Sequence, residues 1–153
     1  MICRIAVKED FPSLAKMRWD FRQESGEEIA VVGKAEFLEK CVDFLADQTH
    51  LYTYWVAEID GDIVSHIFVN EVKLVPRPCR VSDSFAYLTN VYTKPDFRQK
   101  GIGAELLNAV IEWSKTKDFE ILLVYPSENS VNFYKRSGFQ SDDEIMKLVL
   151  RDY

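Results

Sequence analysis

The sequence has no long hydrophobic run, because no stretch approaches the 18 or so consecutive apolar residues of a membrane-spanning helix. Its three cysteines, Cys3, Cys41 and Cys79, form no CxxC pair, and neither histidine, His50 nor His66, lies near a cysteine. This pattern argues against a zinc site and a disulfide framework. The first residues also lack the apolar segment of a signal peptide. We therefore expect a cytoplasmic protein with reduced thiols, no metal and no membrane segment.

An excess of positive charge is missing as well. The chain has 19 Lys and Arg against 25 Asp and Glu, a net charge of −6, so its surface repels phosphate backbones, which argues against general nucleic-acid binding but not against a local basic patch that holds a small anion. Apolar residues make up 47% and charged residues 29%, as in soluble globular proteins. At 153 residues, without a linker or repeat, we expect one domain over residues 1–153.

The hydrophobic periodicity alternates between strand and helix patterns. It predicts strands over 2–7, 52–59, 63–72, 85–93, 121–125 and one or two more within 139–150, and helices over 11–25, 35–47, 101–115 and 126–136. Asp10 is the expected N-cap of the first helix, and Asp60-Gly61 predicts a tight hairpin turn. The fold class is therefore α/β (α+β), with a mixed, mostly antiparallel central sheet of six to seven strands and helices on both faces.

The segment 88–107 predicts an anion site. A strand runs through a turn into a helix whose start contains Gly101 and Gly103, and the backbone N–H groups at a helix start lack intrahelical acceptors. Glycines there remove the Cβ atoms that would keep a phosphate away from those amides. Lys94, Arg98 and Lys100 precede them with one aspartate, a local charge of +2. The alternative is that the glycines only tighten the turn.

Three blocks resemble one family. Arg98-Gln-Lys-Gly-Ile-Gly-Ala104 resembles the Arg/Gln-x-x-Gly-x-Gly/Ala loop of the GNAT superfamily of acyl-CoA-dependent N-acyltransferases. Val91–Phe97 is similar to the strand and turn before that loop, and Asn132–Phe139 is similar to the family's Tyr-x-x-x-Gly-Phe segment. The resemblance follows the order of elements over essentially the whole chain, and it implies a GNAT-like fold.

The resemblance also implies how acetyl-CoA would be held. Backbone groups of Val91 and Thr93 would pair with the pantetheine arm, and the Val91 N–H would polarise the thioester carbonyl. Amides from 99 to 104 would hold the pyrophosphate, and Tyr134 would place its hydroxyl beside the sulfur. The residues implied for this binding are Val91, Tyr92, Thr93, Arg98, Gln99, Lys100, Gly101, Ile102, Gly103, Ala104, Ser127, Asn129 and Tyr134.

A catalytic base is harder to assign. Many relatives place a carboxylate on the fourth strand, where this sequence has Thr89 and Asn90, neither of which can accept a proton from an ammonium group. Glu71 near the end of the third strand is the first candidate, followed by Glu58 and His66. Tyr134 is the candidate partner of the leaving thiolate, either protonating it or only donating a hydrogen bond.

These features together indicate an acyltransferase. The resemblance implies transfer of an acetyl group from acetyl-CoA, as co-substrate, to a primary amine of a small molecule or peptide, by direct attack in a ternary complex. The acidic surface favours a cationic acceptor by long-range steering. The alternatives are a non-catalytic CoA-binding or sensing module and an interaction protein with a vestigial loop. A homodimer is common in similar proteins, and the acceptor is not encoded in any single motif.

Overall fold

The computed structural model describes residues 1–26, 32–79, 83–141, 145, 146, 148 and 150. Its helices are α1 (Phe11–Ser25), α2 (Lys34–Asp47), α3 (Ile102–Thr116) and α4 (Val131–Arg136), and its strands are β1 (Ile2–Ile5), β2 (Tyr52–Ile59), β3 (Asp62–Lys73), β4 (Ser84–Thr93) and β5 (Leu122–Val124). Short 3₁₀ turns cover Lys8–Asp10, Gln48–His50, Pro95–Phe97 and Glu128–Ser130. Among the described residues no helix is long and apolar enough to cross a membrane.

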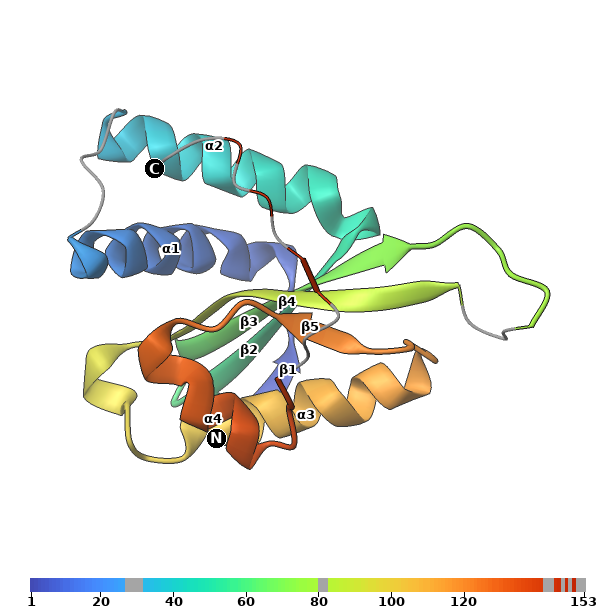
Figure 1. The fold of residues 1–153 in the computed structure, drawn as a ribbon. Helices are drawn as coiled ribbons and strands as arrows, with labels where there is room; N and C mark the ends of the chain where they lie inside the picture. Colours follow the sequence, from blue (N-terminus) through green and yellow to red (C-terminus); the bar gives the residue numbers. More distant parts are fainter. Residues whose placement is uncertain (27–31, 80–82, 142–144, 147, 149, 151–153) are drawn as a thin grey trace.

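The strands form one sheet in the order β1-β2-β3-β4-β5. The first three pairings are antiparallel, and β4 pairs with β5 in parallel, so the sheet is mixed and mostly antiparallel as expected (Figure 1). Asp60 and Gly61 join β2 to β3, both with positive φ, as the predicted hairpin requires. In the part of the chain that the structure describes, the sheet has five strands, so the expectation of six to seven was wrong.

The strand or strands predicted over 139–150 fall partly outside the described residues. Residues 142–144, 147 and 149 lie outside the described residues, and none of the others in this range forms a strand. The side chains of Met146, Leu148 and Leu150 are exposed. Alternation alone predicted the strand, but a strand forms only when its backbone pairs with a neighbour and one of its faces is buried.

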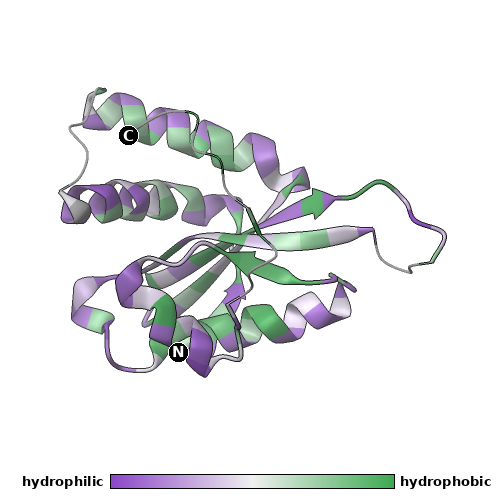
Figure 2. Ribbon diagram, in the orientation of Figure 1, coloured by the Kyte–Doolittle hydropathy of each residue, from purple (hydrophilic) through white to green (hydrophobic). Residues whose placement is uncertain are grey.

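Helices cover both faces of the sheet, as predicted. On one face α1 and α2 pack over Tyr54, Val56 and Phe68, and on the other α3 and α4 pack over Ala57, Val69 and Leu88 with related residues. Figure 2 shows hydrophilic and hydrophobic positions alternating along the helices, as expected of helices with one buried side. The sheet therefore separates two apolar cores.

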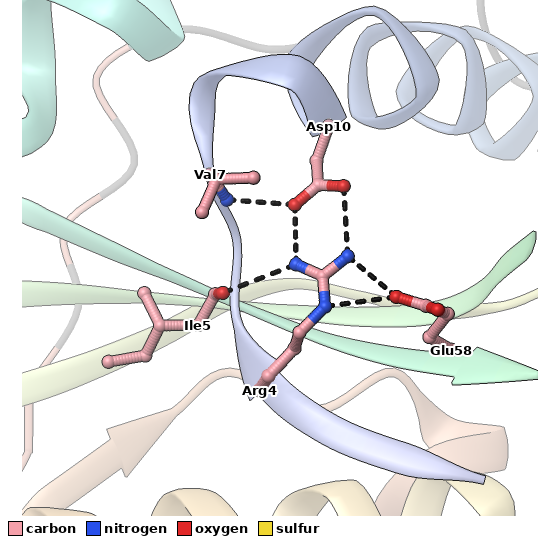
Figure 3. Close-up of polar contacts among 5 residues, drawn as sticks. All are labelled: Arg4, Ile5, Val7, Asp10 and Glu58. Atoms are coloured by element: carbon pink, nitrogen blue, oxygen red, sulfur yellow. Dashed lines mark hydrogen bonds and ion pairs between the residues drawn. The ribbon is translucent and has the colours of Figure 1, made fainter. Parts of the chain in front are cut away.

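An ion-pair cluster joins β1 to the start of α1 (Figure 3). Arg4 donates Nη1 to Asp10 at 2.6 Å and Nη2 to Glu58 at 2.7 Å, and Asp10 also accepts the Val7 backbone N–H at 2.8 Å. The hydrogen bond from Arg4 lowers the pKa of Asp10. Asp10 therefore precedes α1 as predicted, but its side chain makes no cap bond to that helix and instead binds Arg4.

Candidate active site

The sheet opens between β4 and β5. Their pairing runs from Ala86 with Leu122 to Leu88 with Val124, and β4 continues to Thr93 without a β5 partner. The opening continues into a cleft of about 900 Å³. The cleft is lined by residues of α1, β4, β5, α4 and the loop before α3. It therefore connects both faces of the sheet at one edge of β4.

A bulge interrupts β4 at the opening. His66 pairs with Tyr92 and Phe68 pairs with Thr89, so Asn90 and Val91 together oppose Ile67. Asn90 has a φ of 50°, a left-handed conformation that asparagine tolerates better than most residues. A bulge leaves one residue out of the regular ladder. The bulge was not predicted from the sequence. Its one local sign is the tolerance of asparagine, here Asn90, for a left-handed conformation.

The start of α3 faces the cleft. Gly101 is the N-cap residue with a φ of 80°, and Gln99 has a φ of 59°. No side chain caps this end within the described residues, so the first amides of α3 are available to an outside acceptor. Gly101, Ile102, Gly103 and Ala104 all line the cleft. The geometry is that of an anion site at a helix start.

The two glycines of this loop have different roles. A Cβ at Gly101 would meet nothing within 4 Å, so glycine is favoured there by its positive φ. A Cβ at Gly103 would meet Thr93 Oγ1 at 3.3 Å and the Phe133 ring at 3.6 Å. Gly103 is therefore small because α3 packs closely against β4 and α4. The interpretation in which both glycines make room for a ligand stays a prediction, since Gly103 also lines the cleft.

A polar network links this loop to the end of α1. Glu24 accepts hydrogen bonds from the Tyr92 hydroxyl and from Arg98 Nη2, the latter at 2.6 Å, and Arg98 Nε donates to the Thr93 carbonyl at 2.8 Å. Burial raises the pKa of Glu24, but the bonds from Tyr92 and Arg98 outweigh it and leave that pKa below its ordinary value. Lys100 lies outside the cleft lining, with its Nζ 5.5 Å from the centre of the Phe97 ring.

Tyr134 lies at the cleft from the α4 side. Its side chain is 6% exposed, and its ring packs edge-on against Phe133 and Phe139. Burial, with a smaller effect of the nearby Tyr87, raises the pKa of Tyr134 to about 12. The phenol therefore stays protonated at neutral pH and can donate a hydrogen bond into the cleft.

The segment between β5 and α4 completes the lining. Ser127 and Asn129 both line the cleft, as the resemblance implied. Ser127 makes no cap bond to the backbone, and its hydroxyl donates to Ser130 Oγ at 3.0 Å. Both side chains therefore border the space that a ligand in the cleft would occupy.

The three candidate bases lie elsewhere. Glu71 pairs with Ala86 in the sheet and lines a separate pocket of about 160 Å³. Glu58 binds Arg4 and does not line the cleft. His66 is fully buried between the Phe68 and Tyr92 rings, and burial lowers its pKa to about 3. The described residues that line the cleft include one carboxylate, that of Glu24.

Comparison with known proteins agrees with this geometry. Residues 11–139 match the Acetyltransferase (GNAT) family. The chain belongs to this family. The family match covers α1 through the segment after α4, and therefore every element that lines the cleft.

Among solved structures, a predicted acetyltransferase of Clostridium acetobutylicum, crystallised with acetyl-CoA, is 25% identical with a TM-score of 0.78, covering 97% of this chain and 96% of that one. An uncharacterised N-acetyltransferase of Methanocaldococcus jannaschii is 35% identical over 69 residues, 43% of this chain and 30% of that protein. A probable N-acetyltransferase of Xenopus tropicalis, camello, is 28% identical over 104 residues, 65% of this chain and 44% of that protein. The matches span less than half the length of these two curated relatives.

For this GNAT chain, most residues implied by the resemblance lie together. Those that line the cleft are Val91, Tyr92, Thr93, Arg98, Gln99, Gly101, Ile102, Gly103, Ala104, Ser127, Asn129 and Tyr134. Lys100 and Glu71 do not line it. The sequence interpretation missed Glu24 and Arg18, which reach the cleft from α1, because a helix position far from the motif gives no local sign of what it faces.

Proposed function

We propose that the chain is a single-domain N-acetyltransferase that moves an acetyl group from acetyl-CoA to a primary amine by direct attack in a ternary complex. The observation that supports this most strongly is the placement of the uncapped start of α3 at the mouth of a cleft that follows the open edge of β4. One end of that cleft suits a diphosphate and the other an extended arm. Family membership supports the same reaction.

The loop before α3 fits a diphosphate. Its amides have no side-chain cap within the described residues, the space beside Gly101 is open, and Arg98 lies on the same loop. Backbone amides at a helix start favour phosphate oxygens. When the ligand is bound, Arg98 would exchange its bond to Glu24 for one to the diphosphate, because the Arg98 side chain is 45% exposed and this ion pair is open to solvent.

The bulge in β4 supplies the electrophilic assistance. A thioester provides an activated acetyl group, and its carbonyl oxygen becomes negatively charged when the amine attacks. The Val91 N–H, displaced from the regular ladder by the bulge, would donate to that oxygen. A donor of this kind typically lowers the barrier by about 3–4 kcal/mol.

Tyr134 would stabilise the leaving sulfur. With a pKa of about 12, its phenol is a weaker acid than an ordinary thiol of about 8.5, so complete proton transfer to the thiolate is unfavourable. We propose that Tyr134 donates a hydrogen bond to the sulfur, and that the proton for the thiolate comes from elsewhere, such as water or the amine.

The base for the amine is not assigned to a side chain. We do not propose Glu71, which lies in a separate pocket, and Glu24 has a lowered pKa because it accepts bonds from Tyr92 and Arg98. We therefore propose that water in the cleft takes the proton from the ammonium group before attack. A rate that rises with pH up to the ordinary amine pKa would follow from this.

Two measurements test the proposal. Acetyl-CoA should raise the melting temperature, and thiol release from acetyl-CoA should depend on an added primary amine from a broad panel. The described lining of the cleft includes one carboxylate, that of Glu24, whose pKa is lowered, and this also favours a second candidate, a CoA-binding module without turnover. Binding with no amine-dependent thiol release would support that module, and an unchanged melting temperature would refute both functions.

A further inference from the structure

Arg18 lies in the cleft, and no carboxylate of the described residues forms an ion pair with it. Arg18 of α1 is half-buried, lines the cleft, and donates Nη1 to Asn90 Oδ1 at 2.9 Å, a neutral oxygen. No ion pair recorded in the described ranges includes Arg18, whereas Arg4, Arg77 and Arg98 each pair with a carboxylate. A half-buried cation without a counter-ion is partly desolvated at a cost, and an anionic ligand in the cleft would offset that cost.

The described neighbours of Arg18 offset its charge only weakly, since Cys41 raises its pKa but the net effect on that pKa is a lowering. Burial lowers its pKa, and the positive charge of Arg22 on the next turn of α1 lowers it further. The Phe21 ring lies 5.8 Å from the guanidinium carbon, which places an aromatic wall beside the charge. Only one N–H of a five-donor group is used by Asn90, so the planar fork of the guanidinium remains available for a carboxylate or phosphate.

The position of Arg18 separates it from the diphosphate site. Arg18 approaches β4 from α1, on the face opposite to α3 and α4, and its partner Asn90 is the bulge residue next to Val91. A group held by Arg18 therefore lies near the reacting carbonyl but on the far side of the sheet from the start of α3. That is the side from which the attacking amine would enter.

We infer that the acceptor is a primary amine that also bears an anionic group, a carboxylate or a phosphate, and that Arg18 binds this group. The inference rests on the proposed acetyl transfer and names its substrate class. It replaces the expectation of a cationic acceptor, because the net charge of −6 acts at long range while Arg18 acts in contact with the ligand. Arg18 acts here as a specificity residue that orients the amine toward the acetyl group.

The test compares matched amines. Turnover with acetyl-CoA is measured for the twenty amino acids against their amides, and for β-alanine against β-alaninamide and O-phosphoethanolamine against ethanolamine. We expect at least one amine with an anionic group to exceed its counterpart without that group about 10-fold or more in kcat/KM, since a charge-assisted bond is lost in the counterpart. The amino acids and the phosphate ester distinguish the two anions.

Variants then assign the effect to Arg18. Arg18→Met should reduce kcat/KM for the anionic amine about 10- to 100-fold more than kcat/KM for its counterpart without the anionic group, mainly through KM, and should change acetyl-CoA affinity much less. Arg18→Lys should restore part of the loss. Lys16→Met is the matched control, because Lys16 is an exposed cation on the same helix that pairs with Asp20. Calorimetry with the N-acetylated product should show the same loss of affinity in Arg18→Met.

A failure of the inference can be distinguished from a failure of the proposed function. If amines are acetylated but no anionic amine exceeds its counterpart without the anionic group, or if Arg18→Met leaves that preference intact, the inference is wrong while acetyl transfer stands. If Arg18→Met instead changes selection among acetyl-CoA, malonyl-CoA and succinyl-CoA, Arg18 reads the acyl group and the inference is also wrong. If no amine supports thiol release at all, the proposed function itself fails.

Discussion

Tyr134→Phe tests the chemistry at the sulfur. The change removes one hydroxyl and leaves the ring, which packs against Phe133 and Phe139 at centroid distances of 5.0 and 5.5 Å. We therefore expect little change in the free energy of unfolding and in acetyl-CoA affinity. The lost interaction is made to a sulfur that becomes charged only as the bond breaks, so the effect should appear in kcat.

The magnitude follows from the raised pKa. Moving a proton from a phenol of pKa about 12 to a thiolate of about 8.5 costs about 5 kcal/mol, so Tyr134 acts as a hydrogen-bond donor. A hydrogen bond to a charged group contributes about 1.5–3 kcal/mol, which predicts a fall in kcat of about 10- to 150-fold. A phenol of this pKa also predicts no loss of rate from its ionisation up to about pH 10.

The assay measures thiol release with the best amine of the panel, and calorimetry measures acetyl-CoA affinity. Tyr52→Phe is the control, because Tyr52 lies outside the cleft and its hydroxyl accepts a bond from Asn70. A kcat for Tyr134→Phe within about twofold of the parent would remove Tyr134 from the mechanism. A large loss of acetyl-CoA affinity instead would make Tyr134 a binding residue.

Three other predictions concern the loop before α3 and the Glu24 network. Gly101→Ala should cost about 1–2 kcal/mol of strain, because the φ of Gly101 is 80°, and it should weaken acetyl-CoA binding. Gly61→Ala is the control, since Gly61 has a φ of 85° but lies in the β2–β3 turn. It should lower the melting temperature without changing acetyl-CoA affinity. Glu24→Gln should strengthen acetyl-CoA binding by releasing Arg98; weaker binding in calorimetry would contradict this role. Because the pKa of Glu24 is lowered, its carboxylate stabilises the folded chain above its ordinary pKa of about 4.3, and this stability is lost as pH falls through the lower folded pKa. The difference in unfolding free energy between the parent and Glu24→Gln, at most about 1 kcal/mol at neutral pH, should therefore shrink in acid.

Local patterns predicted the elements of the fold well. The alternation of β2 and β3 around Asp60-Gly61, and the apolar stripe of α3 with Leu106 and Val110, correspond to elements in the structure. These features depend on neighbours in the chain, which a sequence displays directly. The strand expected over 139–150 depended on a distant pairing partner, which alternation cannot supply.

Only the parts of the site that form a continuous sequence motif could be predicted from the sequence. The loop from Arg98 to Ala104 lies at the cleft. The sequence could point to it because the groups expected to bind the diphosphate are the loop's own backbone amides. Glu24 and Arg18 were missed because their role in the site depends on which strand α1 crosses. The bulge at Asn90 was missed for a similar reason, since a residue count on β4 shows no excess until the register with β3 is known.

The most direct measurement is a crystal structure with CoA bound. The account predicts the diphosphate within hydrogen-bonding distance of backbone amides between Gln99 and Ala104, and the pantetheine arm beside β4 at Val91–Thr93. A diphosphate bound elsewhere, with the amides at the start of α3 facing only protein groups, would contradict the central claim.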